Sequence, residues 1–154
     1  MKGKGRGTIA RQTAFWDSSA IVPLCCFQPQ SAKARQTARL YGRQVVWWAT
    51  AVESKSALNR LLRNGNLTAP ESRQAFRKLE FMRQEWNEVH PSELLREQAE
   101  RLLGIHELRA ADALQLSAAL VWCSQFPRGH YLIGSDNRLS NAAEAEGFTV
   151  IRLT

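Results

Sequence analysis

The sequence has no long apolar run and few cysteines, and both absences limit where the protein can work. No apolar stretch approaches the roughly 18 residues that cross a bilayer, and the basic first residues are not followed by the apolar core of a signal peptide. The 3 cysteines, Cys25, Cys26 and Cys123, cannot all pair within one chain, and their spacing does not suit zinc. We therefore expect a cytoplasmic protein with reduced cysteines and no membrane contact.

Several motifs of common enzyme classes are also missing. The chain contains no glycine-rich phosphate loop, no nucleophile elbow and no Cys-x-x-Cys pair. Its 3 histidines are scattered beside predicted helix breaks, which argues against a zinc site or a histidine base. With 44% hydrophobic residues and neither repeats nor linkers after residue 14, the sequence fits one globular domain.

Acidic residues are fewer than basic ones, 14 against 21, which leaves a formal net charge of +7. Such a charge attracts polyanions, because lysine and arginine neutralise phosphates and release counterions. Part of the excess comes from Lys2, Lys4, Arg6 and Arg11, which lie among glycines. We predict a flexible basic arm over residues 1–13, a domain over residues 14–154, and nucleic acid as the partner. Whether the arm contacts that partner or is only a solvated tail stays open.

Apolar and amphipathic segments alternate along the rest of the chain. Short apolar runs predict strands, and apolar residues at helical spacing predict helices. The expected strands cover residues 14–16, 45–49, 131–134 and 148–153, and the expected helices begin near residues 20, 30, 50, 68, 92, 110 and 137. This order predicts an α/β fold with a mainly parallel central sheet flanked by helices on both faces.

Capping residues mark several of the expected helix ends. Thr50-Ala-Val-Glu53 and Thr68-Ala-Pro-Glu71 both have the spacing of a capping box. Gly42 stands where a left-handed cap would close the second helix, and Gly104 is expected to end the helix that begins near residue 92. The tryptophans that we expect to be buried on strands are Trp16, Trp47 and Trp48.

Four acidic residues stand at the starts of predicted helices. Asp17 follows the first strand, Glu53 lies in the first turn after the second strand, and Asp136 follows the third. Because ligand sites in open parallel sheets form beyond the carboxyl ends of the strands, these three should share one edge. Asp112, near the start of the helix over residues 110–122, could face the same edge, although strand order alone does not place it there.

Carboxylates gathered at one edge repel one another, and a divalent cation bound between them relieves the repulsion. Oxygen ligands favour Mg²⁺ or Mn²⁺, and such an ion can polarise a phosphate and activate water for phosphodiester hydrolysis. Each acid also has a structural explanation as a helix N-cap, a capping-box residue or a partner of the helix dipole. Four acids at matching edge positions favour a shared site.

Four segments containing these acids occur in order between Phe15 and the C-terminus. They are Phe15-Trp-Asp-Ser-Ser-Ala-Ile-Val-Pro-Leu24, Thr50-Ala-Val-Glu53, Leu108-Arg-Ala-Ala-Asp-Ala-Leu-Gln-Leu116 and Ser135-Asp-Asn-Arg-Leu139. They resemble the acidic motifs of PIN domains, and the third most specifically resembles VapC-type toxins of toxin–antitoxin pairs. The resemblance implies that the catalytic, metal-binding acids are Asp17, Glu53, Asp112 and Asp136. It also implies that Ser18 and Ser135 support the site. Whether Arg109, in the third of these segments, contacts RNA phosphate or is only a solvated charge stays open.

The resemblance further implies a single PIN-like domain, Mg²⁺- or Mn²⁺-dependent cleavage of RNA, a homodimeric toxin and a cognate antitoxin that blocks the acidic pocket. The basic arm departs from the family pattern, and whether it contacts RNA, the antitoxin or neither stays open. A non-catalytic PIN-like module that binds RNA or a partner is the alternative. A signalling receiver domain fits less well, because Asp17 stands alone after the first strand and no lysine follows Lys78.

Overall fold

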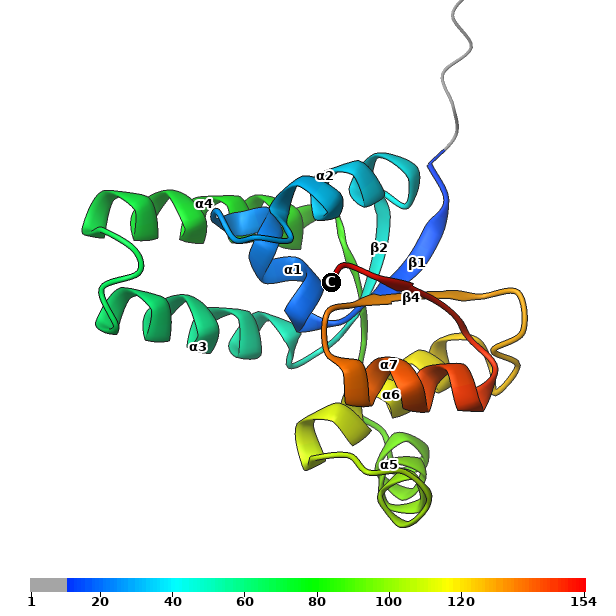
Figure 1. The fold of residues 1–154 in the computed structure, drawn as a ribbon. Coiled ribbons are helices and arrows are strands. Elements are labelled where there is room, and N and C mark those ends of the chain that lie inside the picture. Colours follow the sequence, from blue (N-terminus) through cyan, green and yellow to red (C-terminus); the bar gives the residue numbers. More distant parts are fainter. Residues whose placement is uncertain (1–10) are drawn as a thin grey trace, which may run out of the picture.

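A parallel sheet lies at the centre of the molecule, between two groups of helices (Figure 1). The computed structural model describes residues 11–154, so most of the predicted arm, residues 1–10, lies outside the described residues. The strands have the order β3-β2-β1-β4-β5, and every neighbouring pair is parallel. Their bounds are Thr13–Trp16 (β1), Arg43–Trp47 (β2), Asn87–Val89 (β3), Tyr131–Gly134 (β4) and Thr149–Arg152 (β5).

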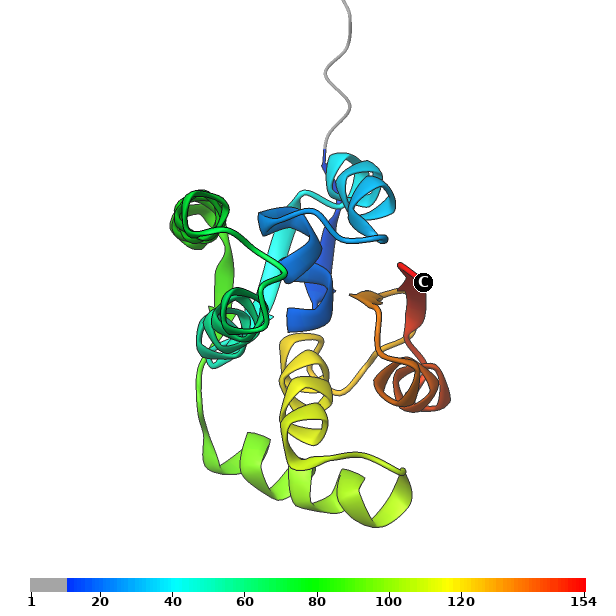
Figure 2. The ribbon, with the colours of Figure 1, turned by 60° about the vertical axis from the view of Figure 1, so that its left-hand side comes forward.

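Helices cover both faces of this sheet, which confirms the predicted α/β class. Figures 1 and 2 show α1 to α4 on one face and α5 to α7 on the other, in agreement with the two clusters of buried side chains. The helices are α1 (Ser18–Cys25), α2 (Ser31–Leu40), α3 (Thr50–Arg63), α4 (Ala69–Glu85), α5 (Glu93–Ile105), α6 (Ala110–Trp122) and α7 (Asn137–Glu146). Within residues 11–154, no helix combines the length and apolarity needed to cross a membrane.

Strand β1 is buried on both faces, which explains its continuous apolar sequence. Ala14 and Trp16 pack against the layer of α1 to α4, whereas Phe15 packs against the layer of α5 to α7. The indole Nε1 of Trp16 also donates a hydrogen bond to the carbonyl oxygen of Tyr41 at 3.1 Å. The carboxyl end of β1, where Asp17 follows, is therefore held from both layers.

The strand order places a switch point beside the carboxyl end of β1. From β1 the chain proceeds through β2 to β3 on one side, and β4 and β5 are added later on the other side. Connections that leave a parallel sheet in opposite directions open a crevice at its carboxyl edge, where ligands of such folds bind.

Two glycines do not act as predicted. Gly42 is not left-handed, and α2 is instead followed by Tyr41 with φ −115° as its cap. A Cβ at Gly42 would lie 2.8 Å from the carbonyl oxygen of Ala38 in the last turn of α2, so the helix end leaves no room for a side chain at this position. Gly104 does not end a helix but lies inside α5, which continues to Ile105.

Strand β3 and Trp48 also differ from the prediction. Strand β3 was not predicted; it has only the residues Asn-Glu-Val and lies at the edge of the sheet directly after α4. A short, partly solvated edge strand has little apolar pattern to reveal it. Trp48 lies beyond the end of β2 with 50% of its surface exposed, whereas the other two tryptophans expected on strands are buried.

Candidate active site

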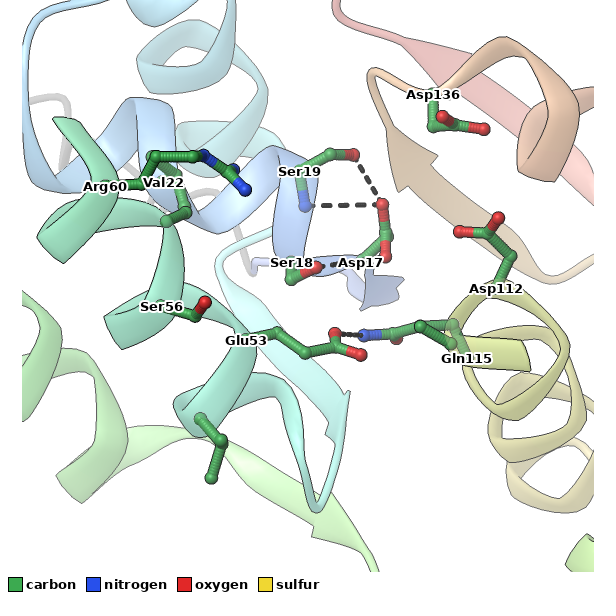
Figure 3. Close-up of a pocket in the computed structure, with 13 residues that line it drawn as sticks. Asp17, Ser18, Ser19, Val22, Glu53, Ser56, Arg60, Asp112, Gln115 and Asp136 are labelled. Atoms are coloured by element: carbon green, nitrogen blue, oxygen red, sulfur yellow. Dashed lines mark hydrogen bonds between the residues drawn. The ribbon is translucent and has the colours of Figure 1, made fainter. Parts of the chain in front are cut away.

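All four predicted acids line one cleft, which lies beyond the carboxyl ends of β1, β2 and β4 (Figure 3). The cleft has a volume of about 480 Å³, and its walls come from α1, α3, α6 and the turn after β4. The polar side chains that line it belong to Asp17, Ser18, Ser19, Glu53, Ser56, Arg60, Asp112, Gln115 and Asp136.

Asp17 is positioned by the turn from β1 into α1, where it is the N-cap residue. Its Oδ2 accepts hydrogen bonds from the backbone N–H of Ser19, at 3.3 Å, and from the Ser19 hydroxyl. The Ser19 Oγ in turn accepts a hydrogen bond from the backbone N–H of Ser135 at 2.9 Å. Ser19 therefore connects the carboxylate after β1 to the backbone after β4.

Burial dominates the electrostatics of Asp17, which is only 3% exposed. Desolvation raises the pKa of its carboxyl from the ordinary 3.8 to about 6, although the hydrogen bonds from Ser19 act in the opposite direction. The neighbouring carboxylates of Glu53 and Asp112 contribute smaller parts of this rise. An ionised Asp17 is thus costly in the protein alone, and a cation in the cleft would stabilise it.

Glu53 lies in the first turn of α3 and is held by Gln115 of α6. The Gln115 Nε2 donates to Glu53 Oε2 at 2.6 Å and to Thr50 Oγ1 at 3.1 Å. The predicted capping box is therefore wrong here, because Ala49 is the N-cap residue and Thr50 is buried against Gln115. Burial raises the pKa of Glu53, hydrogen bonds from Gln115 and Ser18 lower it, and the Asp112 carboxylate raises it.

Asp112 and Asp136 complete the acidic cleft from the other side of the switch point. Asp112 lies in the first turn of α6, where its Oδ2 accepts from the backbone N–H of Arg109 at 3.3 Å. Burial raises the pKa of Asp112, the bond from Arg109 lowers it, and the Asp136 carboxylate raises it. Asp136 is exposed, and as the N-cap residue of α7 it accepts from the backbone N–H of Leu139 at 2.9 Å.

The residues predicted to support the site occupy different places. Ser18 lines the cleft, and its hydroxyl lies 3.5 Å from Asp17 Oδ1. Ser135 does not itself line the cleft, but its backbone N–H donates to the Ser19 Oγ and its hydroxyl donates to the Ser19 carbonyl oxygen at 3.4 Å. Arg109 is exposed and is also absent from the cleft lining.

Three residues of the cleft, Ser19, Gln115 and Arg60, were not predicted, although local spacing could have suggested them. Ser19 stands two residues after Asp17, where an N-cap carboxylate accepts backbone and hydroxyl hydrogen bonds. Gln115 stands three residues after Asp112, and Arg60 stands seven residues after Glu53. Both spacings place the second residue on the same helix face as the acid.

The donor set of the cleft fits Mg²⁺ or Mn²⁺. All four acids offer carboxylate oxygens, and neighbouring carboxylates of the cleft contribute to the raised pKa values of Asp17, Glu53 and Asp112. Within residues 11–154, no three or more His, Cys, Asp or Glu side chains stand close enough to hold one ion together. Magnesium usually takes one or two carboxylates and retains several waters, so two of these acids with water ligands would suffice.

Several solved structures, among them a toxin and a toxin–antitoxin complex, share this fold at low sequence identity. VapC20 of Mycobacterium tuberculosis, a sarcin–ricin loop cleaving toxin, matches with a TM-score of 0.65 and 18% identity over 91% of this chain and 99% of that chain. A toxin–antitoxin complex from Klebsiella pneumoniae matches with a TM-score of 0.63 and 14% identity over 92% and 98% of the respective chains. For FitAcB of Neisseria gonorrhoeae the TM-score is 0.62, again with 14% identity over 92% and 98%.

These comparisons establish the fold. No protein-family model matches the sequence. No curated protein matches it either. The likeness nevertheless covers nearly the whole of each chain, so the predicted PIN-like fold, in the form found in VapC-type toxin structures, is confirmed.

Proposed function

We propose that the protein is a metal-dependent endoribonuclease that acts as the toxin of a type II toxin–antitoxin pair. The observation that carries the proposal is the convergence of four carboxylates, from the starts of α1, α3, α6 and α7, on one cleft at the switch point of a parallel sheet. The fold shared with a toxin that cleaves the sarcin–ricin loop supports RNA as the substrate. The net charge of +7 supports attraction of a polyanion.

The acids proposed to bind Mg²⁺ or Mn²⁺ are Asp17, Glu53, Asp112 and Asp136, with two of them as direct ligands and the others acting through bound water. A bound ion would supply polarisation of the scissile phosphate and activation of a water nucleophile. The protein's own contribution is orientation: Ser19 restrains the carboxylate of Asp17, and Gln115 restrains that of Glu53. Such outer hydrogen bonds reduce the rearrangement needed when the acids bind an ion.

The proposal includes a protein partner. The similar structure from Klebsiella pneumoniae is a toxin–antitoxin complex, which supports an antitoxin that covers the acidic cleft of this protein. A homodimer, a cytoplasmic location and a domain over residues 14–154 preceded by a basic arm belong to the same proposal.

The test is cleavage of RNA by the purified protein. We expect cleavage with Mg²⁺ or Mn²⁺, loss of cleavage with chelator, and a fall of about 100-fold or more in Asp17→Ala and Asp112→Ala, because a metal ion contributes several kcal/mol to stabilising the transition state. Glu97→Ala is the matched control, since Glu97 is an exposed acid of α5 outside the cleft. Circular dichroism checks that each variant is folded.

Two outcomes would contradict the proposal. Folded Asp17→Ala and Asp112→Ala variants that cleave as fast as the parent would show that the acids are not the reaction centre. RNA binding by the parent without turnover under either ion would instead support the non-catalytic RNA-binding module.

A further inference from the structure

Arg60 provides a positive charge at the far end of the acidic cleft. On α3, the residues Glu53, Ser56, Ala57 and Arg60 all line the cleft, at the spacing i, i+3, i+4, i+7 of one helix face. Two helical turns separate Glu53 from Arg60, about 10.5 Å along the helix axis. Figure 3 shows the Arg60 side chain extending along the cleft on the side of α1.

The donors of Arg60 are available. Among the residues that the structure describes, its guanidinium has no ion-pair partner. Lys55 and Arg83 both pair with Glu80, and Arg63 of α3, which has no ion pair within residues 11–154 either, does not line the cleft. Arg60 is exposed, and it is the one basic residue in the described lining of the cleft. An unpaired arginine therefore faces the same space as the four carboxylates.

The small residues between the acidic end of the cleft and Arg60 leave room for a strand of RNA. Ser56 and Ala57 form the surface between Glu53 and Arg60, so no long side chain divides the cleft there. A guanidinium presents donors in a rigid fork that matches the oxygens of a phosphate. One end of the cleft thus suits a cation and the scissile phosphate, and the other end suits a phosphate directly.

We infer that Arg60 binds a non-scissile phosphate of the RNA strand and thereby positions the scissile phosphate over the carboxylates of Asp17, Glu53, Asp112 and Asp136. This inference rests on the proposed ribonuclease function and assigns a substrate-binding residue to it. Arg60 contacts the RNA and is not a ligand of the metal ion. Its loss should therefore weaken RNA binding and leave Mn²⁺ binding intact.

The experiment compares Arg60→Ala, Arg60→Lys and the parent in RNA cleavage at several salt concentrations. We expect Arg60→Ala to raise KM by about 10- to 100-fold, as expected for a lost charge-assisted hydrogen bond, with a smaller change in kcat. The slope of log(kcat/KM) against log salt should become shallower by about 0.7, the value for one phosphate contact on a single strand. Arg60→Lys should keep the parental slope and an intermediate KM.

Arg63→Ala is the control, because Arg63 is an exposed arginine of the same helix that does not line the cleft. It should leave kcat/KM within about twofold of the parent, since a surface charge outside the site contributes little. Mn²⁺ affinity measured by calorimetry should be unchanged or tighter in Arg60→Ala. A KM and a salt slope equal to those of the parent would overturn the inference.

RNA affinity separates failure of this inference from failure of the proposed function. If the parent cleaves no RNA with either ion, the proposed function fails and Arg60 is judged by fluorescence anisotropy of a labelled single-stranded RNA in chelator. A Kd raised about tenfold in Arg60→Ala would still support the phosphate contact. An unchanged Kd would overturn it.

Discussion

At the scale of single residues, the carboxyl of Asp17 is removed from the water that would stabilise its charge. Its pKa is about 6 in the folded protein, whereas the ordinary value of 3.8 applies to the unfolded chain. Between about pH 4 and pH 6 the folded state therefore binds more protons than the unfolded state, and stability falls as the pH rises through this window. The difference corresponds to about 3 kcal/mol once Asp17 is ionised in both states.

We therefore predict that Asp17→Asn stabilises the metal-free protein at pH 7 by up to about 3 kcal/mol, because the amide removes a buried charge. The gain should disappear near pH 4, where the parent carboxyl is protonated in the folded state. Urea denaturation in chelator at the two pH values measures it. Asp136→Asn is the control, since this exposed N-cap accepts asparagine equally well. If Asp17→Asn instead lowered the free energy of unfolding at pH 7, burial of the charged carboxyl would not be what destabilises the metal-free parent.

At the scale of helices and strands, the starts of the helices have both structural and functional roles. Asp17 and Asp136 cap α1 and α7 and also line the cleft, so the two explanations of these acids are compatible. Glu53 differs, because its carboxylate contacts Gln115 instead of closing a capping box. The other predicted capping box, between Thr68 and Glu71 at the start of α4, is confirmed.

Alanine at Gly42 and at Gly104 should change the stability of the protein in opposite directions. Gly42→Ala should destabilise the protein by about 1–3 kcal/mol, because its Cβ would press against the Ala38 carbonyl oxygen. Gly104→Ala should instead stabilise it by about 0.5–1 kcal/mol, since Gly104 lies within α5 with open space around it. Urea midpoints of both variants measure the difference. Equal midpoints would contradict the close approach at Gly42.

At the scale of the whole molecule, the cleft joins the two helical layers over the carboxyl edge of the sheet. Glu53 belongs to α3 on one layer, and Gln115 belongs to α6 on the other. The hydrogen bonds from Gln115 to Glu53 and Thr50 cross between these layers. The geometry of the acids thus depends on how the layers pack.

We predict that Gln115→Leu reduces Mn²⁺ affinity by about 10- to 100-fold, because Glu53 loses the partner that orients it. The rise of the melting temperature with Mn²⁺ concentration should shrink accordingly, since a ligand stabilises the folded state in proportion to its affinity. Gln98→Leu is the control, because Gln98 is a buried glutamine whose partner is Gln125, outside the cleft. Equal Mn²⁺-induced shifts in Gln115→Leu and the parent would contradict this role.

The sequence by itself determined the α/β class and the edge on which the acids lie. The predicted ranges of α6 and β4 coincide with the observed ones, because apolar periodicity is a local signal. Asp17, Glu53 and Asp136 could be assigned to one edge because all parallel strands end on the same side.

Only the tertiary structure decided what surrounds those acids. Gln115 and Glu53 are 62 residues apart in sequence, and nothing near either one predicts that an amide of α6 holds a carboxylate of α3. The exposure of Trp48 and the polar edge strand β3 likewise depend on which segments cover the sheet. Periodicity reports which face of an element is buried, whereas hydrogen bonds and desolvation depend on residues that folding brings from elsewhere in the chain.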